Sequence, residues 1–164
     1  LASALAAACE RQGGGLVGSA IHNDLRLEGR FFNIYAEGAE TRDPLPLGIQ
    51  WMIDFDKPEF RGGAAIRQRR EAGFDKKIIG VRAEPGQDLA PGMALFDGEA
   101  EAGRMVKTCV SHVLGCRMGL ALIKIECAYA GLTFRLDRPD GPEVATISMP
   151  PIMPKSLSVK LDEV

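Results

Sequence analysis

Residues 93–102 read Met-Ala-Leu-Phe-Asp-Gly-Glu-Ala-Glu-Ala and carry the clearest turn signal in the chain. Asp97 and Gly98 suit the two central positions of a primed hairpin turn, because both positions require a positive φ that these residue types tolerate. Candidate strands flank the turn, from Met93 to Phe96 and from Ala102 to Cys109. This stretch therefore predicts two antiparallel strands joined by a tight hairpin.

Further short strands follow at regular spacing on both sides of this hairpin. Gly, Pro or Asp separates them, which is typical of a small all-β sandwich or barrel. This pattern of short strands begins after Gly73, so we place a domain boundary near residue 75. The full set of expected strands is Ile78 to Ala83, Met93 to Phe96, Ala102 to Cys109, Met118 to Ile125, Thr133 to Leu136 and Val144 to Ser148.

The residues before that boundary predict a mixture of helices and strands. The alanine-rich residues 2–12 and the arginine-rich segment from Ala64 to Ala72 are expected to be helices. The prolines near residue 45 predict an extended crossing. The single tryptophan, Trp51, is expected in the core. Strands are expected from Ile21 to Leu27, from Phe31 to Tyr35 and from Ile49 to Phe55.

Glu28 is the residue in this region that most suggests a binding role. Alternation over Leu25–Glu28 places two leucines on one face of a strand, and Arg26 with Glu28 on the other. Glu28 is thus directed away from the leucines, where a ligand cleft would lie. Two interpretations stay open from residue chemistry alone: the carboxylate binds a ligand, or it pairs with Arg26.

Composition and charge exclude several function classes. The 164 residues include 20 Lys and Arg and 22 Asp and Glu, which gives a net charge of −2. The chain therefore lacks the excess of positive charge that attracts nucleic acid or an anionic membrane. No apolar run approaches the roughly 20 residues of a membrane span. The four cysteines form no C-x-x-C pair and are too sparse for a disulfide framework, which indicates reduced thiols and a cytoplasmic location.

A zinc site is the one metal hypothesis that the cysteines raise. Cys109, His112 and Cys116 supply three soft ligands in one short segment, and Cys127 or His22 would have to complete the tetrahedron. The spacing is not a common finger spacing, and the segment falls on an expected strand and turn. Free thiols are therefore favoured, and we expect no metal.

Several phrases of the chain, taken in order, resemble the aminomethyltransferase family, which comprises the T-protein of the glycine cleavage system and its relatives. The likeness spans nearly the whole chain. Departures include Ile21–Asp24 in place of the family's A-R-D phrase and His112 in place of a proline. The similar phrases are Leu25–Glu28 to R-L-E, Gly48–Trp51 to G-x-x-W, Lys57–Gly62 to K-x-x-F-x-G, Ser111–Gly115 to S-P-T-L-G, and Pro150–Pro154 to L-P-F-x-x-P.

The resemblance implies an α+β fold that corresponds to the C-terminal portion of the family. Residues 1–74 would be the remnant of an α/β folate-binding domain, and residues 75–164 the family's small antiparallel β-barrel. Family members transfer a one-carbon unit from an aminomethyl-lipoyl arm, carried by the H-protein, onto tetrahydrofolate. The chain begins at Leu1 without a methionine, and we expect an N-terminal part of the same protein to be missing.

The resemblance also implies roles for two residues. Glu28 stands where the family's glutamate holds the pterin ring, and a carboxylate accepts hydrogen bonds from the ring N–H and the neighbouring amino group at once. Lys57 stands at the place of a ligand-contacting arginine, and it keeps the charge without the planar fork. A surface lysine without a role is the alternative for Lys57.

Both residues would bind a reduced folate, the co-substrate, and neither is catalytic. The family's orienting aspartate lies upstream of the residues that match, so we expect this polypeptide alone to be inactive. The expected partners are a lipoyl carrier similar to the H-protein and the missing N-terminal part, with neither nucleic acid nor membrane. The alternative is a non-catalytic folate-binding protein of the iron–sulfur-cluster maintenance type, although the chain lacks the K-G-C-Y-x-G-Q-E phrase of those relatives.

Overall fold

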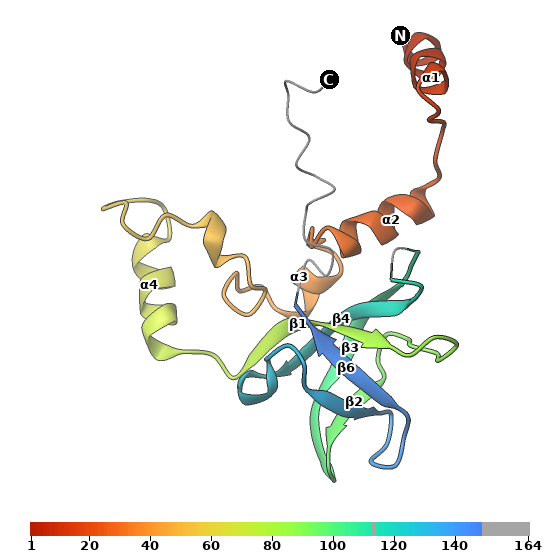
Figure 1. The fold of residues 1–164 in the computed structure, drawn as a ribbon. Coiled ribbons are helices and arrows are strands. Elements are labelled where there is room, and N and C mark those ends of the chain that lie inside the picture. Colours follow the sequence, from red (N-terminus) through yellow and green to blue (C-terminus); the bar gives the residue numbers. More distant parts are fainter. Residues whose placement is uncertain (113, 149–164) are drawn as a thin grey trace.

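The computed structural model of the chain describes residues 1–112 and 114–148, so the phrase Pro150–Pro154 lies outside the described residues. Helices and turns make up the first half and a closed β-barrel the second (Figure 1). None of the helices described has the length and hydrophobicity that crossing a bilayer requires. The two predicted helices are confirmed as α1 and α4. The helices are α1 (Ala2–Arg11), α2 (Ser19–Glu28), α3 (Glu37–Glu40) and α4 (Gly63–Ala72), with the 3₁₀ turns η1 (Gln50–Met52) and η2 (Ile125–Cys127).

Six antiparallel strands close the barrel in the order β1-β4-β3-β2-β5-β6, and β6 pairs with β1. Each strand predicted after residue 75 is present, with ends that differ by a residue or two. The α+β fold class with a small antiparallel β-barrel is therefore confirmed. The strands are β1 (Lys76–Ala83), β2 (Ala94–Asp97), β3 (Ala100–Ser111), β4 (Cys116–Lys124), β5 (Thr133–Leu136) and β6 (Glu143–Ile147).

A tight hairpin forms at this place as predicted, but Gly98 and Glu99, not Asp97 and Gly98, occupy the two central positions of its turn. Asp97 pairs with Ala100 across the β2–β3 hairpin, and Gly98 adopts a φ of 58°. Further along the sheet, β3 and β4 approach so closely that a Cβ atom at Gly119 would lie 2.2 Å from the Lys107 carbonyl oxygen. The turn thus sets the register of the hairpin, and the missing side chain at Gly119 allows the close approach of two backbones.

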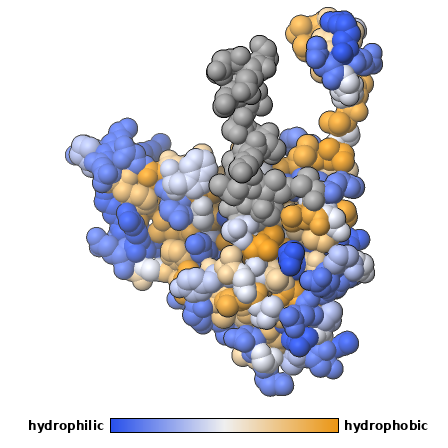
Figure 2. Space-filling model, in the orientation of Figure 1, coloured by the Kyte–Doolittle hydropathy of each residue, from blue (hydrophilic) through white to orange (hydrophobic). Residues whose placement is uncertain are grey.

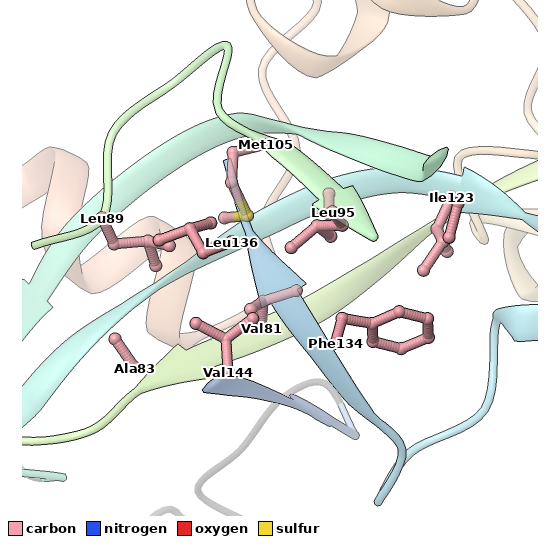
Figure 3. Close-up of a cluster of buried hydrophobic side chains, with 11 residues drawn as sticks. Val81, Ala83, Leu89, Leu95, Met105, Ile123, Phe134, Leu136 and Val144 are labelled. Atoms are coloured by element: carbon pink, nitrogen blue, oxygen red, sulfur yellow. The ribbon is translucent and has the colours of Figure 1, made fainter. Parts of the chain in front are cut away.

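The interior of the barrel is filled by one cluster of apolar side chains to which all six strands contribute (Figure 3). Val81, Leu95 and Ile123 have no exposed surface. Because burial of one such side chain contributes roughly 1.5–3 kcal/mol, this cluster gives the barrel a core of its own. The cluster consists of Val81, Ala83, Leu89, Leu95, Ala102, Met105, Ala121, Ile123, Phe134, Leu136 and Val144.

A second apolar cluster lies on the outer face of β1, β3 and β4. Strand β4 is buried on both sides, because Ile123 belongs to the interior cluster while Leu120 belongs to the outer one. From the N-terminal region, Leu27 and Leu47 join this outer cluster. They hold the end of α2 and the turn that contains Leu47 against the barrel.

The strand predicted over Ile21–Leu27 is wrong, because these residues belong to α2. Gly18, in an extended conformation, precedes the helix, and Gly29 follows it. Leu27 is fully buried, whereas Leu25 is 57% exposed. Side chains two positions apart lie on one face of a strand but on nearly opposite sides of a helix. A short alternation of apolar and charged residues therefore did not distinguish the two.

The strands predicted over Phe31–Tyr35 and Ile49–Phe55 are also wrong. The first segment is a turn in which the Tyr35 N–H donates to Asn33 Oδ1 at 2.8 Å. The second contains η1, and its Trp51 is 78% exposed instead of belonging to the core. Large apolar side chains make both segments look like buried strands, but local hydrogen bonds satisfy their backbone groups without a neighbouring strand.

The extended crossing predicted near residue 45 is instead a compact turn. The Leu45 N–H donates to Asp43 Oδ1 at 3.0 Å, and the Leu47 N–H donates to the Asp43 carbonyl oxygen at 3.3 Å. Proline fixes φ at a value that turns accept as readily as extended chains do, so the two prolines did not decide between them. The turn directs Leu47 into the outer cluster.

Candidate functional site

Glu28 is the last residue of α2 and lies where that helix meets the barrel. Its Oε1 accepts a hydrogen bond from the Ser111 hydroxyl at 2.6 Å. Ser111 is fully buried at the end of β3, and its Oγ also accepts the Leu114 N–H at 3.1 Å. The half-buried carboxylate of Glu28 is therefore held on the barrel by a residue 83 positions away in the sequence.

Arg26 turns away from Glu28 and forms an ion pair with Glu37. Arg26 Nη1 lies 3.0 Å from Glu37 Oε2, and Arg26 Nη2 lies 3.2 Å from Glu37 Oε1. Glu37 is fully buried and also accepts the Asn33 N–H at 2.7 Å. The interpretation in which Glu28 pairs with Arg26 is therefore wrong. The Glu28 carboxylate keeps the capacity to accept further hydrogen bonds.

Two apolar cavities open in the N-terminal region. One, of about 540 Å³, is bordered by Phe32 and Tyr35 among others, and the second, of about 460 Å³, by His22 and Phe31. Glu28 borders neither cavity. These cavities provide apolar and aromatic walls, but they do not supply a slot for a flat heterocycle directly beside the Glu28 carboxylate.

Lys57 lies in the turn before α4, and its side chain is exposed. Its N–H donates to Asp54 Oδ1 at 3.2 Å, and its carbonyl oxygen accepts a hydrogen bond from the Arg67 guanidinium. Glu28, in contrast, is bonded to β3. The cavities of the N-terminal region that the structure describes do not bring the two predicted ligand contacts together.

The residues of the zinc hypothesis lie around the β3–β4 turn. Cys109 and Cys116 are buried free thiols, and His112 is exposed. Burial, with a smaller contribution from the Asp24 and Glu28 carboxylates, raises the pKa of the Cys109 thiol to about 12. Within residues 1–112 and 114–148 no group of three His, Cys, Asp or Glu side chains is suited to a metal ion.

Two residues that the sequence did not single out organise the surroundings of Glu28. Ser111 donates to Glu28, and Glu37 engages Arg26. Each contact joins residues at least 11 positions apart, so no local pattern marks it. The one available signal was the place of Ser111 in the phrase that resembles the family's S-P-T-L-G.

No family model matches the chain, but the chain is similar to curated aminomethyltransferases. It is 29% identical over 115 residues to the aminomethyltransferase of Desulforamulus reducens. This match covers 70% of this chain and 32% of that protein. The identity is 31% over 110 residues for Rubrobacter xylanophilus, with coverage of 66% and 30%. It is 27% over 122 residues for Bdellovibrio bacteriovorus, with coverage of 74% and 34%. The chain therefore spans about a third of the length of the curated relatives it matches.

A solved structure has a similar fold. The crystal structure of glycine cleavage system aminomethyltransferase T from Bartonella henselae matches 64% of this chain and 30% of that chain, with a TM-score of 0.57 and 16% sequence identity. The phrases quoted from the sequence, the barrel and the curated relatives lead to the same assignment. The chain is similar in sequence to the C-terminal portion of aminomethyltransferases, and its fold is similar to that of a glycine cleavage system aminomethyltransferase T.

Proposed function

We propose that this chain is part of a tetrahydrofolate-dependent aminomethyltransferase-like enzyme that transfers a one-carbon unit, a diverged relative of the glycine cleavage T-protein. The relationship to aminomethyltransferases supports the reaction class. The observation that carries the proposal is the Glu28 carboxylate, which Ser111 holds in place and Arg26 leaves free. In this proposal residues 1–74 belong to the folate-binding domain and residues 75–164 to the β-barrel domain.

The Glu28 carboxylate would orient the pterin ring of tetrahydrofolate. Ser111 occupies one acceptor position on Oε1, and an ionised carboxylate offers about four such positions. The remaining positions suit a ring N–H and its adjacent amino group, which present two parallel donors. Lys57, on an exposed turn, would meet the carboxylates at the other end of the ligand through a weaker, solvent-screened contact.

Large apolar side chains on the surface of the N-terminal region support a polypeptide partner. Phe31, Tyr35 and Trp51 are 72%, 91% and 78% exposed. Figure 2 shows apolar side chains gathered around α2. Exposed apolar surface, where it is contiguous, marks interaction sites, and the curated relatives contain much sequence that this chain does not span. We infer that the rest of the aminomethyltransferase fold covers this surface and completes the folate slot.

The proposal also defines the expected donor, activity and compartment. The donor would be an aminomethyl-lipoyl group on a carrier similar to the H-protein. Because the reaction depends on positioning a folate nitrogen against this donor, we expect the chain on its own to show no transferase activity. Its four free cysteines, two of them buried, support a reducing, cytoplasmic setting.

The test is a calorimetric titration of the whole protein with a reduced folate. Glu28→Ala should weaken binding by about 1.5–3 kcal/mol, the usual contribution of a hydrogen bond to a charged group. Glu99→Ala is the matched control, because Glu99 is exposed at the tip of the β2–β3 hairpin and should not affect binding. Equal affinity in wild type and Glu28→Ala would refute the role of Glu28. Folate binding without transfer of a one-carbon unit would favour the non-catalytic alternative.

A further inference from the structure

Arg30, which the sequence did not single out, combines three features that oppose folding. Its φ is 61°, in the left-handed region that favours glycine. Its guanidinium is partly buried, and this burial lowers its pKa. Its Nη1 atom is buried without a hydrogen-bond partner among the described residues. Residues that retain such unfavourable features cluster at functional sites.

The neighbouring groups leave the charge of Arg30 uncompensated. Its Nη2 donates to the Leu47 carbonyl oxygen at 2.5 Å, but a carbonyl carries no net charge. The Glu37 carboxylate acts on Arg30 through space, yet it is already engaged by Arg26 and by the Asn33 N–H. Two guanidinium groups thus share one buried carboxylate, and one positive charge is in excess.

Arg30 borders a cavity of about 320 Å³ between the turn that precedes η1 and the strands β1 and β6. Lys77 on β1 brings a second cation to the same cavity. Within the described residues no Asp or Glu borders it, so nothing on its wall opposes the entry of an anion. The polar side chains on its wall are those of Arg30, Gln50, Lys77, Tyr129 and Ser148.

We propose that Arg30 and Lys77 bind an oxyanion in this cavity, either a phosphate or a carboxylate group. A planar guanidinium offers parallel N–H donors to two oxygens, and an ammonium group adds charge without a fixed geometry. An anion in the cavity that Arg30 borders supplies the missing counter-charge. The site shares no residue with the proposed folate contacts Glu28 and Lys57, so it does not depend on them.

A purely structural role would make a different prediction. Glycine at position 30 would adopt the same backbone conformation without strain, without a partly buried cation and without an unsatisfied donor. A structural arginine should therefore lower the stability of the protein when it is replaced. An arginine retained for binding should lose the ligand on replacement while the stability of the ligand-free protein is kept or increased.

The experiment titrates the whole chain with inorganic phosphate and, separately, with glutarate, at constant ionic strength so that screening does not change. Arg30→Gly should weaken the affinity for the bound anion by roughly tenfold or more, as expected for the loss of a charge-assisted hydrogen bond. Its thermal midpoint without anion should stay equal or rise. Lys77→Gln should weaken the affinity by a smaller factor. Arg138→Gln, which removes an exposed cation paired with Asp140, should leave it unchanged.

The two anions also identify the chemistry of the ligand. Tighter binding of phosphate indicates a phosphorylated ligand, tighter binding of glutarate indicates a carboxylate, and both results support the site. The proposal is overturned if the wild-type chain binds neither anion, or if Arg30→Gly binds as tightly as wild type. If Arg30→Gly does not fold, Lys77→Gln decides: reduced affinity supports the proposal, and unchanged affinity overturns it.

Discussion

The barrel and the N-terminal region differ in where their apolar side chains lie. In the barrel, apolar residues from every strand meet in one enclosed cluster (Figure 3). In residues 1–74 the buried hydrophobic side chains are those of Leu27, Leu45 and Leu47, while Leu16 is 92% and Trp51 78% exposed. A closed sheet provides its own opposing layer, whereas α2 packs on the outer face of the barrel and buries one leucine, Leu27, against it.

This difference indicates that two kinds of interaction stabilise the two regions. The barrel relies on the burial of apolar surface. The N-terminal region is attached to the outside of the barrel through Leu27 and Leu47, and the buried ion pair of Arg26 with Glu37 holds its own segments together. Substitutions in each region can therefore separate the two contributions.

The largest effect is expected from breaking the buried ion pair. Arg26→Met leaves the fully buried Glu37 without its cation, so the free energy of unfolding should fall by about 3–5 kcal/mol. Urea unfolding followed by circular dichroism measures the change. The control is Arg138→Met, because the pair of Arg138 with Asp140 is exposed and should contribute little. Similar losses in both variants would contradict a special role for the buried pair.

A matched pair of leucine substitutions tests the core of the barrel. Leu95→Ala removes a side chain with no exposed surface and should lower the free energy of unfolding by about 2–5 kcal/mol. Leu16→Ala, at a leucine that is 92% exposed, should change it by less than about 0.5 kcal/mol. The same urea experiment compares them. A loss at Leu16 as large as that at Leu95 would show that the N-terminal region has a core of its own.

The cysteines extend the comparison to reactivity. Cys9 on α1 is exposed, whereas Cys109 on β3 is buried and its pKa is raised to about 12, so few of its thiols are ionised at pH 8. Iodoacetamide should label Cys9 at least roughly tenfold faster than Cys109, because the thiolate is the reactive form. Peptide mass spectrometry after timed alkylation gives both rates. Equal rates would mean that the barrel opens readily.

The same pKa shift predicts a pH dependence of stability. The ordinary pKa of the thiol, 9.0, applies to the unfolded chain, and the folded value is about 12. Between these values the folded state binds more protons, so the contribution of Cys109 is complete below pH 9 and is lost as pH rises toward 12. Cys109→Val should therefore show a smaller loss of stability over this interval than wild type. An identical slope in the two proteins would remove Cys109 as a cause.

The sequence predicted the barrel well because its local signals agree with its long-range pairing. Asp97 and Gly98 suit a hairpin turn by themselves, and the strands that flank them also pair in the folded sheet. Before residue 75 the signals were short and ambiguous. Alternation at Leu25 and Leu27 fitted a strand as well as a helix, and Trp51 lies on the surface although its size suggested the core.

The candidate site was predictable only in part, for a related reason. The resemblance to a family singled out Glu28, but its partner Ser111 is 83 positions away and no spacing rule connects them. Arg30 carries no motif at all. Its proposed role is argued from a backbone angle and an unsatisfied nitrogen, and both are properties of the folded chain that its amino-acid type does not reveal.

One hydrogen bond, from Ser111 at the end of β3 to Glu28 at the end of α2, links the two regions at the candidate site. Since these residues lie at the ends of α2 and β3, the direction of the carboxylate depends on how the helix is oriented against the barrel. The orientation of the barrel would then affect the binding of any ligand that Glu28 contacts. Ligand affinity would in turn report the orientation of the barrel.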